Sequence, residues 1–403
     1  MAKTNLAVFF SLLSLVLFPS LGYSYGASSL AFGLLLWTLV QISFNYYLIK
    51  KAVFFLLNTK LIYILIFIII HYFVVLIFNK DENLINFNKF LVSLLLVNLI
   101  FITSFILNDK LKLIDKKSLN LILNSITLFY LFILALSLLI RSPFFPNNLK
   151  AVIFFSEPSH YALSVAPFYI YSVLQMNVSN ARFILLLFLI MTLIIQNATL
   201  LLIIIFGIII HVLKTYKNIN FFIICALFII LLFSFIGIDF DYYFDRFIYS
   251  SDNYNMSLLV YLSGWERALI SIQNTLLFGV GFQQFGFDYL SGFFYDRLSI
   301  IGANNLNIYD GASVGSKLVG EFGIFGIFFI MIYIFYFIKI FFELLRKNLN
   351  SIDSLNIFYK VSFLVFSFCI FIRGTGYFSE LTLLFFTSII YMLDKFHEIK
   401  SSK

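Results

Sequence analysis

A glutamate and a histidine stand at the start of a strongly apolar run, in the segment Phe155-Ser156-Glu157-Pro158-Ser159-His160-Tyr161. A carboxylate at the lip of an apolar helix is costly unless it is paired or functional. Pro158 suits the first turn of a helix, and Ser156 could cap that turn. Spacing alone favours a capped helix with an acidic residue near its positive end. The functional interpretation of Glu157 stays open beside it.

A second group of candidates lies between residues 261 and 286. Its first part is typical of an amphipathic helix, and its second part, Gly279–Gly286, is typical of a turn with close backbone approach. A surface helix with a Glu–Arg pair, followed by a flexible hinge, is the structural alternative. The polar and aromatic residues of this group are Tyr261, Trp265, Glu266, Arg267, Gln283 and Gln284.

Two later segments also carry isolated charges. In the segment from Lys317 to Gly326, Gly323 and Gly326 are interpreted as small residues at a helix–helix contact. Arg373 is followed directly by Gly374-Thr375-Gly376-Tyr377. Such an arginine either snorkels to the membrane surface or lines a cavity on the outer side of the membrane.

Several common kinds of site are missing from the sequence. There is no P-loop, no GxGxxG and no HExxH pattern. The four histidines are scattered, and the two cysteines, Cys225 and Cys369, lie inside apolar runs. We therefore expect no metal, no cofactor and no ATP-driven pump.

The composition identifies the solvent that these residues require. Of 403 residues, 62% are hydrophobic and 11% are charged, against about 25% charged in a soluble domain. A soluble fold cannot bury this much apolar surface. The composition excludes a soluble enzyme, a disordered chain and a nucleic-acid-binding domain. It predicts an all-α polytopic integral membrane protein.

Apolar runs long enough to cross a bilayer predict about twelve transmembrane helices. The first run is interpreted as a membrane helix and not as a signal peptide, because another run follows immediately and no small-x-small cleavage site stands out. The seventh and eighth runs are short and meet near Gln196, as two tilted helices or one broken pair. The predicted runs are 5–22, 26–48, 58–78, 90–108, 119–140, 152–175, 183–197, 199–213, 219–238, 318–341, 356–373 and 378–393.

The positive charges are sorted between the two sides of this topology. One set of alternate connections holds 18 of the 27 Lys and Arg residues, which predicts that both termini are cytoplasmic. The inner set is almost entirely Lys, whereas five of the nine outer charges are Arg. Arginine has the planar fork that binds phosphate and carboxylate. The chain divides into helices at 1–238, one large outer loop at 239–317 that we expect to be folded, and helices with a cytoplasmic C-terminus at 318–403.

Together and in this order, these segments resemble the Wzy-type O-antigen and capsular polysaccharide polymerases, which are related to the O-antigen ligases. The resemblance covers residues 150–380 and is most specific over 261–286. The N-terminal third is similar only in being helical and apolar. The segments that carry the resemblance are Ser156-Glu157-Pro158-Ser159, Ser263-Gly264-Trp265-Glu266-Arg267-Ala268, Gly279–Gly286, Ser316-Lys317-Leu318 and Glu321–Gly326.

The resemblance implies a glycosyltransferase of the bacterial inner membrane. It would transfer an undecaprenyl-diphosphate-linked glycan onto a lipid-linked repeat unit at the periplasmic face, with a chain-length regulator as a partner and without nucleic acid. Arg267 would bind the diphosphate, with Arg246 and Arg373 as helpers. Glu157 would accept the acceptor proton, with His160 beside it and Glu266 as the alternative. Tyr261, Trp265, Gln283 and Gln284 would contact the sugars.

Three other functions remain open. An O-antigen ligase is expected to carry a His in the outer loop before the tenth span, and residues 302–313 contain none. A lipid-linked oligosaccharide flippase is expected to carry charges at mid-membrane, whereas here they gather on one face. A non-catalytic membrane scaffold is the third alternative.

Overall fold

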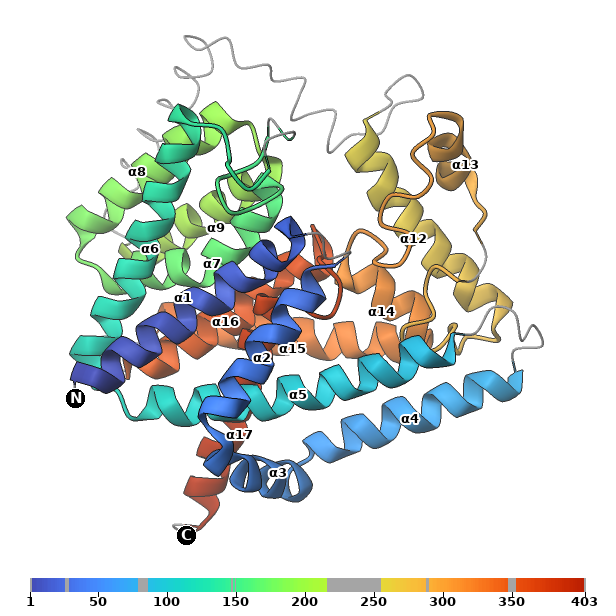
Figure 1. The fold of residues 1–403 in the computed structure, drawn as a ribbon, viewed down its shortest axis with the longest axis horizontal. Coiled ribbons are helices and arrows are strands. Elements are labelled where there is room, and N and C mark those ends of the chain that lie inside the picture. The colour runs from blue at the N-terminus through green and yellow to red at the C-terminus, as the bar shows by residue number, and fades with distance from the viewer. Residues whose placement is uncertain are drawn as a thin grey trace.

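The computed structural model describes residues 2–25, 29–78, 86–145, 148, 150–215, 255–287, 290–346 and 353–401. Most of these residues lie in helices, which gather into one body in Figure 1. Within this part, the one recorded β contact is an isolated bridge between Val152 and Phe155. The predicted all-α fold is confirmed for the described residues.

The helices form three groups along the chain. The first is α1 (Ala2–Ser24), α2 (Leu30–Phe44), the 3-10 helix η1 (Tyr46–Leu48), α3 (Ile49–Asn58), α4 (Leu61–Phe78), α5 (Phe87–Lys112) and α6 (Lys116–Leu139). The second is α7 (Pro158–Gln175), α8 (Val178–Ile195) and α9 (Ala198–Thr215). The third is α12 (Met256–Asn274), α13 (Phe293–Ile300), α14 (Val314–Phe322), α15 (Ile324–Arg346), α16 (Ser354–Phe371) and α17 (Glu380–Ser401).

Eight helices of the described part are long and apolar enough to cross a membrane, namely α1, α4, α5, α6, α8, α9, α15 and α16. The number becomes nine if the bent pair formed by α2 and η1–α3 counts as one span. Helices of this length and composition indicate a polytopic membrane protein. Twelve spans stay a prediction, and the predicted run 219–238 lies outside the described residues.

Two predicted runs are not single helices. The run 26–48 is interrupted after Phe44, where the chain bends by 85° into η1 and α3. The run 318–341 is divided at Gly323, whose φ of 57° and ψ of −129° only glycine adopts readily. A Cβ there would lie 1.9 Å from the Leu277 carbonyl oxygen. Apolar composition did not reveal these breaks, because the segments before and after each break are apolar.

The seventh and eighth predicted runs are two helices. Gln196 ends α8 in the left-handed conformation, with φ of 54°. The Asn197 side chain then accepts a hydrogen bond of 2.8 Å from the Leu200 amide and so caps the start of α9. The connection therefore presents two amide side chains at the ends of packed helices.

The ion pairs agree with the predicted sorting of charge. Each of the six pairs named here joins two residues of the inner set of connections or two of the outer set, and none of them joins one set to the other. The inner pairs are Lys51–Asp109, Lys112–Asp394 and Lys360–Glu343. The outer pairs are Lys317–Asp310, Lys317–Glu321 and Arg373–Glu157. The two faces are thus distinct, although which face is cytoplasmic stays a prediction.

The described part of the large loop is folded. Helix α12 packs against α13 and α14, to the right in Figure 1. A small separate core joins Leu259 and Val260 of α12 to Leu298 of α13 and to Ala303 and Ala312. Residues 239–254, which include Arg246, lie outside the described residues.

Candidate functional site

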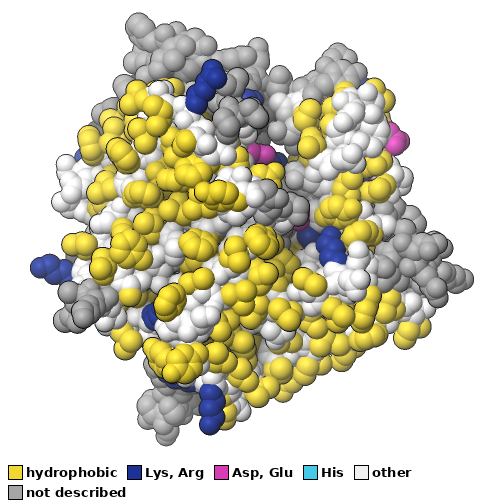
Figure 2. Space-filling view, in the orientation of Figure 1, with side chains coloured by type: hydrophobic (Ala, Val, Ile, Leu, Met, Phe, Trp, Pro, Cys, Tyr) yellow, Lys and Arg dark blue, Asp and Glu magenta, His cyan; other side chains and the backbone are white. Residues whose placement is uncertain are grey.

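A cavity of about 730 Å³ opens where the start of α7, the α8–α9 connection, the start of α12 and the end of α16 meet. All of these segments belong to the predicted outer side of the membrane. In the space-filling view, acidic and basic side chains are visible in a recess between the α6–α9 region and the α12–α13 region (Figure 2). The cavity is therefore lined by charged and polar residues as well as by apolar ones.

Glu157 lies on the wall of this cavity. It is the N-cap residue of α7, but its side chain makes no capping hydrogen bond, and Pro158 follows in the first turn. The expectation that Ser156 caps this helix is wrong, since its hydroxyl lies 3.4 Å from His160 Nδ1. The Glu157 carboxylate instead accepts a hydrogen bond of 3.0 Å from Ser159 and faces Arg373.

Arg373 and Glu157 form an ion pair across the cavity wall, with 2.9 Å between Nη2 and Oε2. Burial on its own would raise the pKa of the Glu157 carboxyl, but the positive charge of Arg373 and the neighbouring His160 hold it below its usual value. Glu157 is therefore ionised at neutral pH. Because its side chain is still 47% exposed, a ligand can reach it.

The turn that carries Arg373 rests on the segment before α14. The Gly374 amide donates to the Ala312 carbonyl over 2.8 Å. A Cβ on Gly374 would lie 2.7 Å from the Val314 nitrogen, and Gly376 has a φ of 76°. Only a glycine-rich turn could approach this closely. The Arg-Gly-Thr-Gly turn thus places the guanidinium at the cavity. This agrees with the interpretation that Arg373 lines a cavity on the outer side of the membrane.

Further polar residues that sequence reasoning did not select line the cavity, among them Asn148, Lys150, Gln196 and Asn307. The Asn148 amide donates to the Ser156 carbonyl over 2.6 Å and so joins the 148–150 segment to the start of α7. Each of these residues stands alone in a connection. No local pattern marks them, apart from the apolar run that ends at Gln196.

Tyr261 also lines the cavity, and its hydroxyl donates to the Phe371 carbonyl over 2.8 Å. Trp265, one turn further along α12, does not line it. Its ring packs against Gly315, where a Cβ would be 3.3 Å away. Of the aromatic candidates on this helix, the structure brings Tyr261 to the site.

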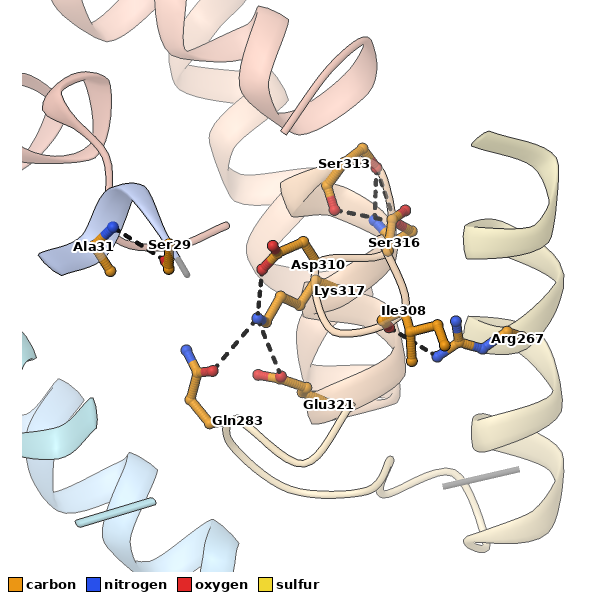
Figure 3. A network of polar contacts seen from close by, with 11 residues as sticks. Ser29, Ala31, Arg267, Gln283, Ile308, Asp310, Ser313, Ser316, Lys317 and Glu321 are labelled. Atoms are coloured by element: carbon orange, nitrogen blue, oxygen red, sulfur yellow. Dashed lines mark hydrogen bonds and ion pairs between the residues drawn. The ribbon is translucent and has the colours of Figure 1, made fainter. Parts of the chain in front are cut away.

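Arg267 lies away from the cavity. Its side chain is 3% exposed, donates to the Ile308 carbonyl over 3.0 Å and packs on the ring of Phe285 at 4.6 Å. In Figure 3 it projects from α12 toward Ile308, apart from the charges around Lys317. The described contacts therefore give it a part in holding the outer loop together, and its predicted role with diphosphate remains untested.

Glu266, the residue before Arg267, contacts the start of α13. Its two carboxylate oxygens accept hydrogen bonds of 2.7 and 2.8 Å from the Phe293 and Phe294 amides, at the start of α13. It is thus an N-terminal cap supplied by another helix. The Glu–Arg pair of the surface-helix alternative is not among the ion pairs of the described residues.

Gln283 and Gln284 lie in the turn that follows α12. This turn makes the close backbone approach that its glycines predicted. A Cβ on Gly279 would lie 2.7 Å from the Glu321 carbonyl carbon, and the Gly281 amide donates to the Glu321 carbonyl over 2.8 Å. Gln284 binds the backbone of Asn86 at the start of α5 through both ends of its amide. Both glutamines are buried, and neither lines the cavity.

A buried charged cluster that the sequence did not predict surrounds Lys317. Its ammonium lies 3.3 Å from Asp310, 3.4 Å from Gln283 and 4.0 Å from Glu321 (Figure 3). The Tyr377 ring, four residues after Arg373, is 5.0 Å from the same nitrogen. Lys317 therefore contacts three loops, and two of them also supply cavity residues.

A comparison of this chain with protein-family models, curated proteins and solved structures finds no match.

Proposed function

We propose that this protein is a surface-polysaccharide polymerase of the bacterial inner membrane, which joins polyprenyl-diphosphate-linked glycans at the outer face. The observation that carries the proposal is the cavity that contains the Glu157–Arg373 pair, on the predicted outer side of the protein. A lipid-linked sugar needs a site at the membrane surface that accommodates both its lipid tail and its polar headgroup. The resemblance described above supplies the reaction.

In this reaction the acceptor hydroxyl oxygen attacks the anomeric carbon of the donor, and the bond from that carbon to the diphosphate oxygen breaks. The electron pair leaves with the polyprenyl diphosphate. Glu157 takes the hydroxyl proton, which suits a carboxylate that is ionised and half exposed. No separate energy source is required, because the diphosphate linkage is already activated.

Arg373 is the guanidinium best placed for the diphosphate. The structure records one hydrogen bond from its side chain, to Glu157, and a guanidinium has five N–H donors. Exposed Lys150 lines the same cavity and adds positive charge. Tyr261 and the amides of Gln196 and Asn307 offer the aromatic and polar surfaces that sugars require.

The test of the function is deletion of the gene, followed by separation of the surface polysaccharide on a gel. Loss of the ladder with one repeat unit still attached to the core is the expected result. Loss of all attached polysaccharide would instead identify a ligase or a flippase. An unchanged ladder would refute all three and leave a non-catalytic scaffold.

The role of Glu157 is tested by Glu157→Gln, which keeps the size of the side chain but cannot take a proton. Chain growth should fall by at least about 100-fold, the usual contribution of a general base. Glu343→Gln, at an ion pair on the opposite face, is the matched control and should grow normal chains. Normal growth with Glu157→Gln would restrict Glu157 to a structural role.

The orientation can be tested separately. Ser291 lies in the described part of the outer loop and is exposed. A Ser291→Cys variant should react with a membrane-impermeant maleimide added to cells whose inner membrane is intact. Reaction only after that membrane is made permeable would reverse the proposed topology.

A further inference from the structure

The second helix is too short to cross a bilayer alone. Helix α2 has 15 residues, or about 22 Å, whereas the hydrocarbon core is about 30 Å thick. At its end the Asn45 side chain donates to the Gln41 carbonyl over 2.6 Å. The chain then bends by 85°. If α2 enters the membrane steeply, η1 and α3 therefore lie nearly parallel to the membrane plane.

Helix α3 has one buried face and one exposed face. Ala52 and Leu56 pack into a small core with residues of α4 and α5, which holds the helix against the protein. On the opposite side Phe54 is 70% exposed and Leu57 is 61% exposed. These large apolar side chains point away from the protein, as in helices that lie in a membrane interface.

Positive charge is concentrated around this exposed face. The described segment 29–78 contains Lys50, Lys51 and Lys60 but no Asp or Glu. Lys51 pairs with Asp109 of α5 over 2.6 Å. Lys50 and Lys60 are exposed and have no ion-pair partner among the described residues. Two lysines beside exposed aromatic and aliphatic side chains thus have no carboxylate of the described residues as an ion-pair partner.

Aromatic side chains mark the level of the interface. Tyr46 and Tyr47 stand at the bend and are 74% and 66% exposed. Tyrosines of this kind are enriched where the headgroups of a bilayer begin. The exposed apolar surface continues from α3 onto α4, a candidate membrane span that begins at Leu61. The occupant of this surface must therefore be apolar at one end and negatively charged at the other.

We propose that α3 lies in the plane of the inner leaflet and binds an anionic phospholipid, with Lys50 and Lys60 at its phosphate and Phe54 and Leu57 among its acyl chains. This inference is independent of the catalytic proposal, because it uses the opposite face of the protein. The lysines would also fix the depth at which α3 lies. The cavity on the other face would then have a defined height above the membrane centre.

The test compares lipids bound to the purified full chain in bilayers of phosphatidylcholine that contain traces of spin-labelled phosphatidylglycerol or spin-labelled phosphatidylcholine. The wild type should prefer phosphatidylglycerol. In Lys50→Gln/Lys60→Gln the preference should fall by about fivefold for each lysine. Lys117→Gln/Lys339→Gln removes two exposed lysines from the same face but not beside α3, and it should keep most of the preference.

Equal losses in the two double variants would overturn the proposal, because net charge alone would then explain the preference. Binding of soluble glycerol phosphate at the same lysines with equal strength would also overturn it, since acyl chains would then be irrelevant. Lys50→Arg/Lys60→Arg should keep the preference. If Lys50→Gln/Lys60→Gln is not recovered in folded form, Lys60→Gln alone should still lose about fivefold.

Discussion

Replacing Lys317 by Met should destabilise the protein by about 2 kcal/mol at pH 8.5, and this loss should shrink as the pH falls toward 5.5. Methionine is nearly as long as lysine, so the substitution removes the ammonium and largely keeps the volume. The Lys317 side chain is 3% exposed and lies within 4.0 Å of Asp310 and Glu321. Its loss therefore leaves two carboxylates without their nearest positive charge.

The magnitude follows from the different exposure of these two carboxylates. Asp310 is 45% exposed, so water replaces the ammonium there at little cost. Glu321 has no exposed surface. Removing the partner of such a buried charge costs about 3–5 kcal/mol. The loss falls below this range because Glu321 can bind a proton instead: its pKa is about 7, so at pH 8.5 the loss is limited to about 2 kcal/mol.

The pH dependence has a definite sign. Burial raises the pKa of Glu321 from 4.5 to about 7, although Lys317 opposes this shift. A carboxyl whose folded-state pKa is raised stabilises the protein fully below its unfolded pKa, and this stability is lost as the pH rises through the folded pKa. Without Lys317 the folded pKa rises further, so the loss continues above pH 7. The deficit of the variant relative to wild type should be small at pH 5.5 and large at pH 8.5.

The measurement is the thermal midpoint of the purified protein in detergent at these two pH values. Lys317→Met should lower the midpoint by about 2 °C at pH 8.5. Lys360→Met is the control, because Lys360 is similarly buried but pairs with Glu343, whose side chain is 34% exposed. Its effect should be smaller and nearly independent of pH. An equal drop in both variants, or the same drop at both pH values, would refute this account of Glu321.

Three further substitutions test the outer loop. Arg267→Ala should reduce the amount of folded protein, with a loss of about 2 kcal/mol or more, because it removes the bond to Ile308; normal amounts with no polymer would instead support its predicted role with diphosphate. Gly264→Ala should cost at least about 2 kcal/mol, seen as a lower thermal midpoint, since the new Cβ would lie 2.0 Å from the Gly311 carbonyl oxygen. Glu266→Ala should cost about 1 kcal/mol and speed amide exchange at the start of α13, while exchange in α16 stays unchanged.

Much of the fold could be predicted from the sequence, because apolar length is a direct signal for a membrane helix. The breaks could not. At Asn45 the residues on both sides are apolar enough to continue a span, and the 85° bend follows from packing of α3 on α4 and α5. At Gly323 the cause is the close approach of Leu277, which is far away in the sequence.

The candidate site, like the fold, has some features that local sequence predicts and others that depend on residues far apart in the chain. Glu157 could be selected because a carboxylate at a helix start is a local signal. Its pairing with Arg373 could not be predicted, since the two residues are 216 positions apart. Arg267 was selected through the resemblance, but the conformation of residues 306–312 makes the Ile308 carbonyl its partner. A motif shows which residues a family keeps, whereas only the fold shows which of them share a cavity.

The position of Arg373 depends on the charged cluster as well as on the cavity. The Gly374 amide binds the Ala312 carbonyl, and the Tyr377 ring lies beside the Lys317 ammonium. Lys317 in turn bonds to Asp310, two residues before Ala312. The turn that presents the guanidinium to Glu157 is thus held at both ends by one segment and one buried lysine. A buried ammonium is costly to maintain. This cost is explained if Lys317 fixes the turn, so that Glu157 and Arg373 can separate and each bind a ligand instead.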